Sequence, residues 1–253
     1  MTIRALRRAV ALALTIAWCM ACLGLMRLCG PLTLERRGRW AQWGSRLILA
    51  ALGIHFQIEG QPPQRGVVVA NHLSYLDILI LSAAMPCCFV AKAEIDKWPV
   101  FGWISRCSGT LFIDRASLAS AQKVSDMIAD RLALSLPVLF FPEGTSSDGS
   151  SLLRFHSRLF EPAILAEAPV TAASVRYILH DGTPERELCW FGDDAFLPHL
   201  WKALGVLGFS AEVRFGEPQV YPHRRVAAET THAEIRALRN GDAMLQPSMT
   251  AQG

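Results

Sequence analysis

A chain of 253 residues, 51% of them hydrophobic, can form one sizeable α/β domain with an attached segment, and its length does not require a second domain. The formal net charge of +3, with no basic tract interleaved with aromatic residues, argues against a nucleic-acid-binding protein. The mean hydropathy of +0.26 is high for a soluble protein, and the mild positive charge suits an anionic membrane surface.

The N-terminal segment accounts for the high hydropathy. Residues 9–26 carry no charge, and their length is close to the ~20 residues that cross a bilayer as a helix. We interpret residues 1–60 as a membrane-anchoring helical segment, with a secretory signal as the alternative because arginines precede the apolar run. Arginines also follow the run, so its flanking charges give no orientation. A helix lying in the membrane interface, or a hairpin with Leu47–Phe56, fits the same pattern, and Trp40 and Trp43 would suit the level of the head groups.

The seven cysteines have no paired spacing that would indicate a disulfide framework. Cys19 and Cys22 form a CxxC motif inside the apolar run, where neither a metal site nor a redox site could be built, and we expect no metal. We therefore expect reduced thiols, and a globular domain that faces the cytoplasm from the inner (cytoplasmic) membrane.

The sequence QPPQRG at residues 61–66 predicts a turn before a globular domain at 61–240. Apolar runs typical of strands alternate there with helical stretches, including an amphipathic helix at Ser117–Leu136 and a last helix at Ala227–Asn240. Residues 241–253 form a predicted flexible tail. The alternation predicts an α/β domain, with a central mixed, partly parallel sheet flanked by helices, after the N-terminal membrane-associated helical segment. The predicted strands are Val67–Ala70, Cys88–Lys92, Thr110–Ile113, Val138–Phe141 and Val170–Tyr177.

The first predicted strand leads into the sequence VVVANHLSYLD, residues 67–77, which brings a histidine close to an aspartate. His72 is expected on the turn after the strand, and Asp77 one turn inside a helix that begins near Ser74. The carboxylate could then accept the Nδ1 proton of the imidazole and leave Nε2 free to take a proton from a hydroxyl group. The alternative is a hydrogen-bonded structural histidine at a helix start.

Two further motifs follow apolar runs: GTLFIDR at residues 109–115 and FPEGTSS at residues 141–147. Because ligand sites in such sheets lie beyond the carboxyl ends of the strands, we expect all three motifs around one crevice. In the second motif, Arg115 could bind a phosphate or carboxylate through its planar guanidinium, or form a surface ion pair with Asp114.

In the third motif, a proline sets a turn and Glu143 presents a carboxylate. Gly144 lets the backbone approach a ligand closely. Backbone amides around Gly144 and Thr145 could then form an oxyanion hole or hold an acceptor oxygen. The alternative is an ordinary turn with a solvated glutamate.

The three motifs, in this order, resemble those of the glycerolphosphate and lysophospholipid acyltransferase family over about residues 67–177. The resemblance implies a membrane-bound enzyme that moves a fatty acyl group from acyl-CoA or acyl carrier protein to the free hydroxyl of a lysolipid. The thioester would be a co-substrate, and no cofactor is expected. The acceptor expected first is 1-acyl-sn-glycerol-3-phosphate, which would give phosphatidic acid. The resemblance implies catalytic roles for His72 and Asp77, and substrate binding by Arg115, Glu143, Gly144 and Thr145.

One departure from the family pattern bears on the acceptor. Ser146 stands where the family usually has an arginine after the threonine, so a cation expected to bind phosphate is missing. Lys92, Arg154 or Arg158 could replace it. Alternatively, the acceptor carries no phosphate monoester, because the SSDG sequence at residues 146–149 resembles members that acylate lyso-ornithine lipid.

Other classes fit the sequence less well. A serine hydrolase would need the GxSxG sequence, which does not occur. A metal-dependent phosphatase would need clustered histidine and aspartate ligands. A catalytically silent lipid-binding membrane protein is the non-enzyme alternative, and the aromatic-rich stretch Leu188–Leu204 would then cover a lipid cleft or rest on the membrane.

Overall fold

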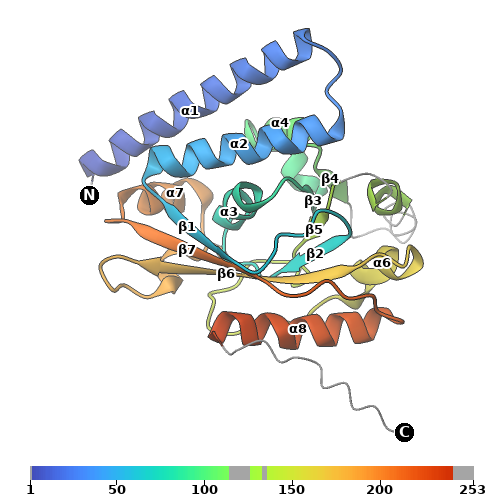
Figure 1. Ribbon diagram of the computed structural model, residues 1–253. Helices are drawn as coiled ribbons and strands as arrows, with labels where there is room; N and C mark the ends of the chain where they lie inside the picture. The colour runs from blue at the N-terminus through green and yellow to red at the C-terminus, as the bar shows by residue number, and fades with distance from the viewer. Residues whose placement is uncertain (1, 114–125, 133–135, 242–253) are drawn as a thin grey trace, which may run out of the picture.

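A seven-stranded sheet lies between two layers of helices in the computed structural model, which describes residues 2–113, 126–132 and 136–241 (Figure 1). The strand order is β1-β7-β6-β2-β5-β3-β4. Every neighbouring pair is parallel except β6 and β7, which run antiparallel. The predicted mixed, partly parallel sheet flanked by helices is therefore confirmed. The strands are β1 (His55–Glu59), β2 (Val67–Ala70), β3 (Cys88–Lys92), β4 (Leu111–Ile113), β5 (Val138–Phe140), β6 (Val170–Leu179) and β7 (Phe209–Phe215).

Most helices lie on one face of the sheet, where α3 packs under α2, and α8 covers the other face (Figure 1). The helices whose ends both lie among the described residues are α1 (Thr2–Leu28), α2 (Leu34–Leu52), α3 (Leu76–Ala84), α4 (Phe101–Ser108), α6 (Glu161–Leu165), α7 (Phe196–Gly205) and α8 (Arg224–Asn240). Short 3-10 turns are η1 (Ala93–Lys97), η2 (Ser157–Phe160) and η3 (Glu185–Leu188).

The sheet separates two hydrophobic cores, and β2 contributes to both. Its residues are buried on both faces, as expected for a central strand of a parallel sheet. Because side chains alternate along a strand, Val68 and Ala70 join the core under α3, while Val67 and Val69 join the core under α8. This central position holds the carboxyl end of β2 firmly between the two layers.

Two strands of the sheet were not predicted. In β7 inward and outward residues alternate, a pattern that the sequence does contain. The edge strand β1 is mostly exposed and follows α2 almost directly, so it offers little apolar signal. Because β1 pairs with β7 along its whole length, the domain boundary predicted at residue 60 falls after a strand of the sheet.

The N-terminal residues form two helices that lie along the domain. Within the described chain, α1 is the one helix long and apolar enough to cross a membrane by length and composition. It packs against α2 and α7. The prediction that Trp40 lies at the head-group level is wrong, because its buried indole Nε1 donates to the Cys19 carbonyl of α1 at 2.9 Å. Trp43 is 40% exposed. Leu47–Phe56 does not form one arm of a hairpin, because the stretch is divided between the end of α2, which packs against α1, and the start of β1.

Candidate active site

The end of β2 is fixed by a side chain that extends the sheet. Asn71, fully buried, accepts the Val175 amide proton of β6 on Oδ1 at 2.8 Å and donates from Nδ2 to the Val175 carbonyl at 3.0 Å. The side chain thereby replaces the backbone as a partner for β6 where the chain turns away. His72 leaves the sheet at this point.

The imidazole of His72 and the carboxylate of Asp77 are in direct contact, with 2.9 Å between Nδ1 and Oδ2. Oδ2 also accepts the backbone amides of Leu73 at 2.7 Å and Ser74 at 3.0 Å. The aspartate thus caps the turn that starts α3 and orients the imidazole with the same oxygen. The helix itself begins at Leu76, slightly later than the sequence suggested.

The other oxygen of Asp77 has a partner that the sequence did not reveal. The hydroxyl of Tyr177, on the neighbouring strand β6, donates to Oδ1. Both side chains are buried. Burial, with the nearby Asp77 charge as a smaller cause, raises the pKa of Tyr177 well above its ordinary value, so the hydroxyl stays protonated and acts as a donor.

The imidazole is also held on its face. The ring of Phe141 stacks on it, with 3.9 Å between centroids and an interplanar angle of 10°. The His72 side chain is 18% exposed, whereas that of Asp77 is fully buried. Among the described residues Nε2 has no hydrogen-bond partner. The arrangement leaves one ring nitrogen able to take a proton from a ligand.

Glu143 joins the third motif to the backbone of His72. Its Oε1 accepts the His72 amide and its Oε2 the Leu153 amide, each at 2.8 Å. The Ser147 amide in turn donates to the His72 carbonyl at 2.9 Å. Burial raises the pKa of the Glu143 carboxyl, against the opposing effect of the two amide bonds. With both oxygens on backbone amides and 3% exposure, Glu143 is placed to position His72.

The turn at Gly144 needs a glycine, because its φ of 77° lies in the left-handed region. The Gly144 amide donates to the Phe141 carbonyl at 3.1 Å and so closes the turn itself. It is therefore not available as the oxyanion donor that the sequence suggested. Thr145 is exposed, and its amide has no hydrogen-bond partner within the part of the chain that the structure describes.

The cations expected around the acceptor are only partly described. Arg115, with Asp114 and most of the helix predicted at Ser117–Leu136, lies outside the described residues, although 126–132 are helical. Arg154 and Arg158 are exposed, and their guanidinium groups have no hydrogen bond or ion pair to any described residue. Arg154 directly follows Leu153, whose amide binds Glu143. Of the two arginines, Arg154 is the closer in sequence to this contact with Glu143.

An aromatic cluster packs beside the imidazole motif. Tyr75 contacts Trp190 and Phe196 edge to face, and its hydroxyl lies 3.1 Å from Nδ1 of His199 on α7. The Trp190 amide donates to the Leu73 carbonyl at 2.8 Å. The stretch predicted to cover the cleft or rest on the membrane therefore packs against the loop that carries His72. Further members of the cluster are Trp98 and Phe101.

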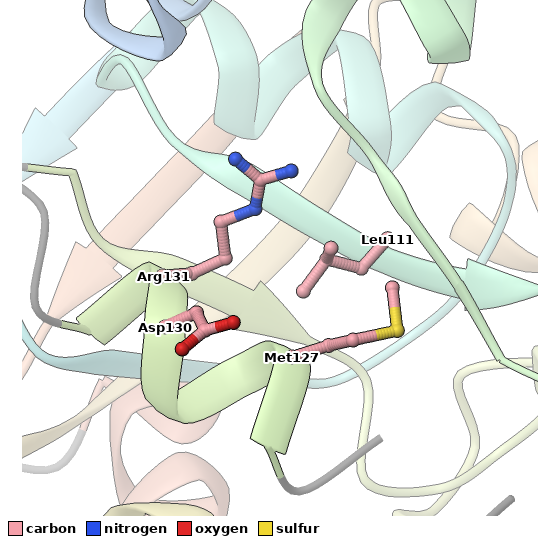
Figure 2. Close-up of a pocket in the computed structure, with 4 residues that line it drawn as sticks. All are labelled: Leu111, Met127, Asp130 and Arg131. Atoms are coloured by element: carbon pink, nitrogen blue, oxygen red, sulfur yellow. The ribbon is translucent and has the colours of Figure 1, made fainter. Parts of the chain in front are cut away.

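A separate cavity of about 270 Å³ lies at the far edge of the sheet, where Leu111 of β4 faces Met127 (Figure 2). Asp130 and Arg131 also line it. Strands β5 and β3 lie between β4 and β2. The cavity is therefore not part of the imidazole site.

Comparison with known proteins agrees with this fold. A family model described as Acyltransferase matches residues 54–176. The lyso-ornithine lipid O-acyltransferase of Pseudomonas aeruginosa is 35% identical over 193 residues, which are 76% of this chain and 74% of that protein. The 1-acyl-sn-glycerol-3-phosphate acyltransferase of Neisseria meningitidis is 37% identical, over 72% of each chain.

The crystal structure of the 1-acyl-sn-glycerophosphate (LPA) acyltransferase PlsC from Thermotoga maritima superposes with a TM-score of 0.67. The match covers 94% of this chain and 95% of that one, at 18% sequence identity. At that identity the structural match establishes the fold alone. The family model spans the His72 and Glu143 motifs, and the identities to the curated relatives over about three quarters of the chain show that this chain belongs to the acyltransferase family.

Proposed function

We propose that the protein transfers a fatty acyl group from a thioester to the hydroxyl of a lysolipid. The proposal rests on the hydrogen bonding of the His72 imidazole. Its Nδ1 is bound to Asp77, while its Nε2 has no partner among the described residues. An acceptor hydroxyl at Nε2 would lose its proton to the ring as its oxygen attacks the thioester carbonyl. No covalent acyl-enzyme is needed, because the thioester is already activated.

The remaining steps use the same groups. Asp77 stabilises the imidazolium that forms, and the exposed amide of Thr145 is our candidate donor to the tetrahedral oxyanion. The carbon–sulfur bond then breaks, the ester remains on the acceptor, and the imidazolium returns its proton to the thiolate that leaves. The donor is acyl-CoA or acyl carrier protein, acting as a co-substrate.

The names of the relatives offer two acceptors, lyso-ornithine lipid and 1-acyl-sn-glycerol-3-phosphate. The replacement of the motif arginine by Ser146 favours lyso-ornithine lipid, because an ornithine head group has no phosphate. The Ser146 hydroxyl donates instead to the Trp190 carbonyl. For the carboxylate of the acceptor we propose Arg154, which is exposed and unpaired among the described residues.

We further propose that the protein is attached to the inner (cytoplasmic) membrane, with the active site facing the cytoplasm. Large apolar side chains are exposed on α1, α4 and α7. These three helices lie on the side of the sheet opposite α8 (Figure 1). Arg8 of α1 donates to the carbonyls of Leu204 and Val206 at the end of α7, at 3.2 and 2.8 Å, which holds α1 along the domain. This geometry favours a helix lying in the membrane interface. The exposed side chains include Leu6, Val10, Leu14, Trp18, Trp103, Leu197 and Trp201.

The test supplies the purified protein with each lysolipid in parallel, pairing each with acyl-CoA and with acyl carrier protein thioester. Free thiol is measured and the lipid product is identified by mass spectrometry. We expect thiol release that depends on the lysolipid, fastest with lyso-ornithine lipid. Arg154→Ala should raise the KM for that acceptor, and Arg158→Ala should not. Thiol release without an acceptor, or lysolipid binding without release, would contradict the proposal.

A further inference from the structure

We propose that Tyr177 is a positioning residue for acyl transfer: its hydroxyl holds the Asp77 carboxylate and, through it, the His72 imidazole. This inference rests on the proposed function, because it assigns Tyr177 a part in the same reaction. Tyr177 lies a hundred residues along the chain from Asp77, at the end of the predicted strand Val170–Tyr177, and no role was predicted for its hydroxyl.

The contacts of Asp77 divide between its two oxygens. Oδ2 accepts from the His72 ring and from the Leu73 and Ser74 amides. Oδ1 accepts from the Tyr177 hydroxyl. Rotation about the Cβ–Cγ bond would move both oxygens. The tyrosine therefore adds a restraint at Oδ1 to those at Oδ2, and together they fix the direction in which the imidazole presents Nε2.

Tyr177 is itself held by its surroundings. Its backbone amide donates to Oε1 of Glu185 at 2.7 Å, and Oε2 of Glu185 binds Arg239 of α8 at 2.7 Å. Its ring packs edge to face against Phe209 of β7, with 5.6 Å between centroids. The register between β6 and β2 is locked by Asn71 at Val175. The hydroxyl therefore occupies a fixed position relative to the end of β2.

The hydroxyl also affects the charge of the site. In a buried setting a hydrogen bond to a carboxylate disperses part of its negative charge. The titratable groups near the hydroxyl are Asp77, Cys189 and Glu185, and those near His72 are Asp77 and Glu143. Without the hydroxyl, Asp77 would attract the imidazolium more strongly, so the protonated and inactive form would persist to higher pH.

The test is Tyr177→Phe, which removes only the hydroxyl. We expect kcat to fall by about 10- to 100-fold, the factor that one hydrogen bond to a charged group is worth. The KM values should stay within about twofold, because Tyr177 touches neither substrate. The acidic limb of the pH profile of kcat/KM should move to higher pH. If Tyr177 had a purely structural role, the folded Tyr177→Phe protein would show the acidic limb of kcat/KM at the same pH as wild type.

Tyr221→Phe is the matched control, since Tyr221 is also buried but lies in the core on the opposite face. It should leave kcat and the pH profile unchanged. If Tyr177→Phe fails to fold, fluorotyrosine provides the second measurement. The chain has three tyrosines, so in a Tyr75→Phe/Tyr221→Phe background only Tyr177 carries the label. The more acidic phenol is a stronger donor, and the acidic limb should move to lower pH than in the same unlabelled background.

A measurement without turnover separates the two proposals. The Nδ1 proton of His72 gives a low-field NMR signal when it is bound to Asp77, and His72→Ala identifies that signal. We expect the signal to shift in Tyr177→Phe and to stay in place in Tyr221→Phe. An unshifted signal, or an unchanged pH profile in an active enzyme, would overturn the role of Tyr177. A wild-type protein that transfers no acyl group to either lysolipid would overturn the proposed function instead.

Discussion

Replacing Asp77 by asparagine tests the imidazole–carboxylate pair with little change of shape. The Asp77 side chain is fully buried and faces only donors: the His72 ring, two backbone amides and the Tyr177 hydroxyl. An asparagine can turn its oxygen toward the ring and the amides, and its amino group toward Tyr177. The tyrosine hydroxyl can rotate to accept, so every buried polar group keeps a partner.

The cost to folding should therefore be modest, about 1–3 kcal/mol for exchanging one charged hydrogen-bond acceptor for a neutral one. The cost to catalysis should be larger, because the imidazolium that forms during the reaction loses its counter-charge. In serine hydrolases the same exchange behind a catalytic histidine lowers kcat by about 10⁴-fold. That factor corresponds to about 5 kcal/mol in the activation free energy.

The assay is thiol release from the thioester donor in the presence of lysolipid, with thermal melting to measure the folded fraction. Asp181→Asn is the matched control, because Asp181 is exposed on a loop and its carboxylate accepts hydrogen bonds from the neighbouring Thr183. We expect a folded Asp77→Asn protein with activity near background. A kcat within about tenfold of wild type would refute the assignment of Asp77.

Two further changes test other contacts. Glu143→Gln places a donor against the His72 or Leu153 amide, and urea denaturation should show unfolding about 1–3 kcal/mol easier. The pKa of Glu143 is raised in the folded protein, so its contribution to the free energy of unfolding is lost as pH rises through that pKa. The difference in unfolding free energy between wild type and Glu143→Gln should therefore narrow as pH rises. Arg8→Ala should speed hydrogen exchange at residues 204–207 about tenfold, whereas the exposed Arg7→Ala should not. A difference in unfolding free energy that does not change with pH would count against the role of Glu143. Equal rates of hydrogen exchange in Arg8→Ala and Arg7→Ala would count against the Arg8 contacts.

The parts of the site that the sequence predicts are local in the chain. The apolar run of β2 and the five-residue step from His72 to Asp77 can be read from one short stretch, and the structure places these side chains in contact. The strands β2 and β5, which lead into the first and third motifs, are central and strongly apolar, so they too carry a clear signal.

The parts that the sequence does not predict depend on pairing between distant segments. Tyr177 meets Asp77 only because β6 lies next to β2. Trp40 is buried because α2 packs against α1 and α4. The motif around Glu143 indicates a carboxylate and free amides, but which backbone groups they bind depends on the fold of the Leu153 loop. Polar contacts of this kind have no periodicity to be recognised.

The most direct test of the central claim, that His72 is the general base, is lysolipid-dependent thiol release by His72→Ala. The matched control is His156→Ala, because His156 is an exposed histidine close in sequence to the third motif. We predict that His72→Ala folds as wild type but releases thiol at the background rate, while His156→Ala retains activity. Thiol release by folded His72→Ala at a rate comparable to wild type would contradict the account.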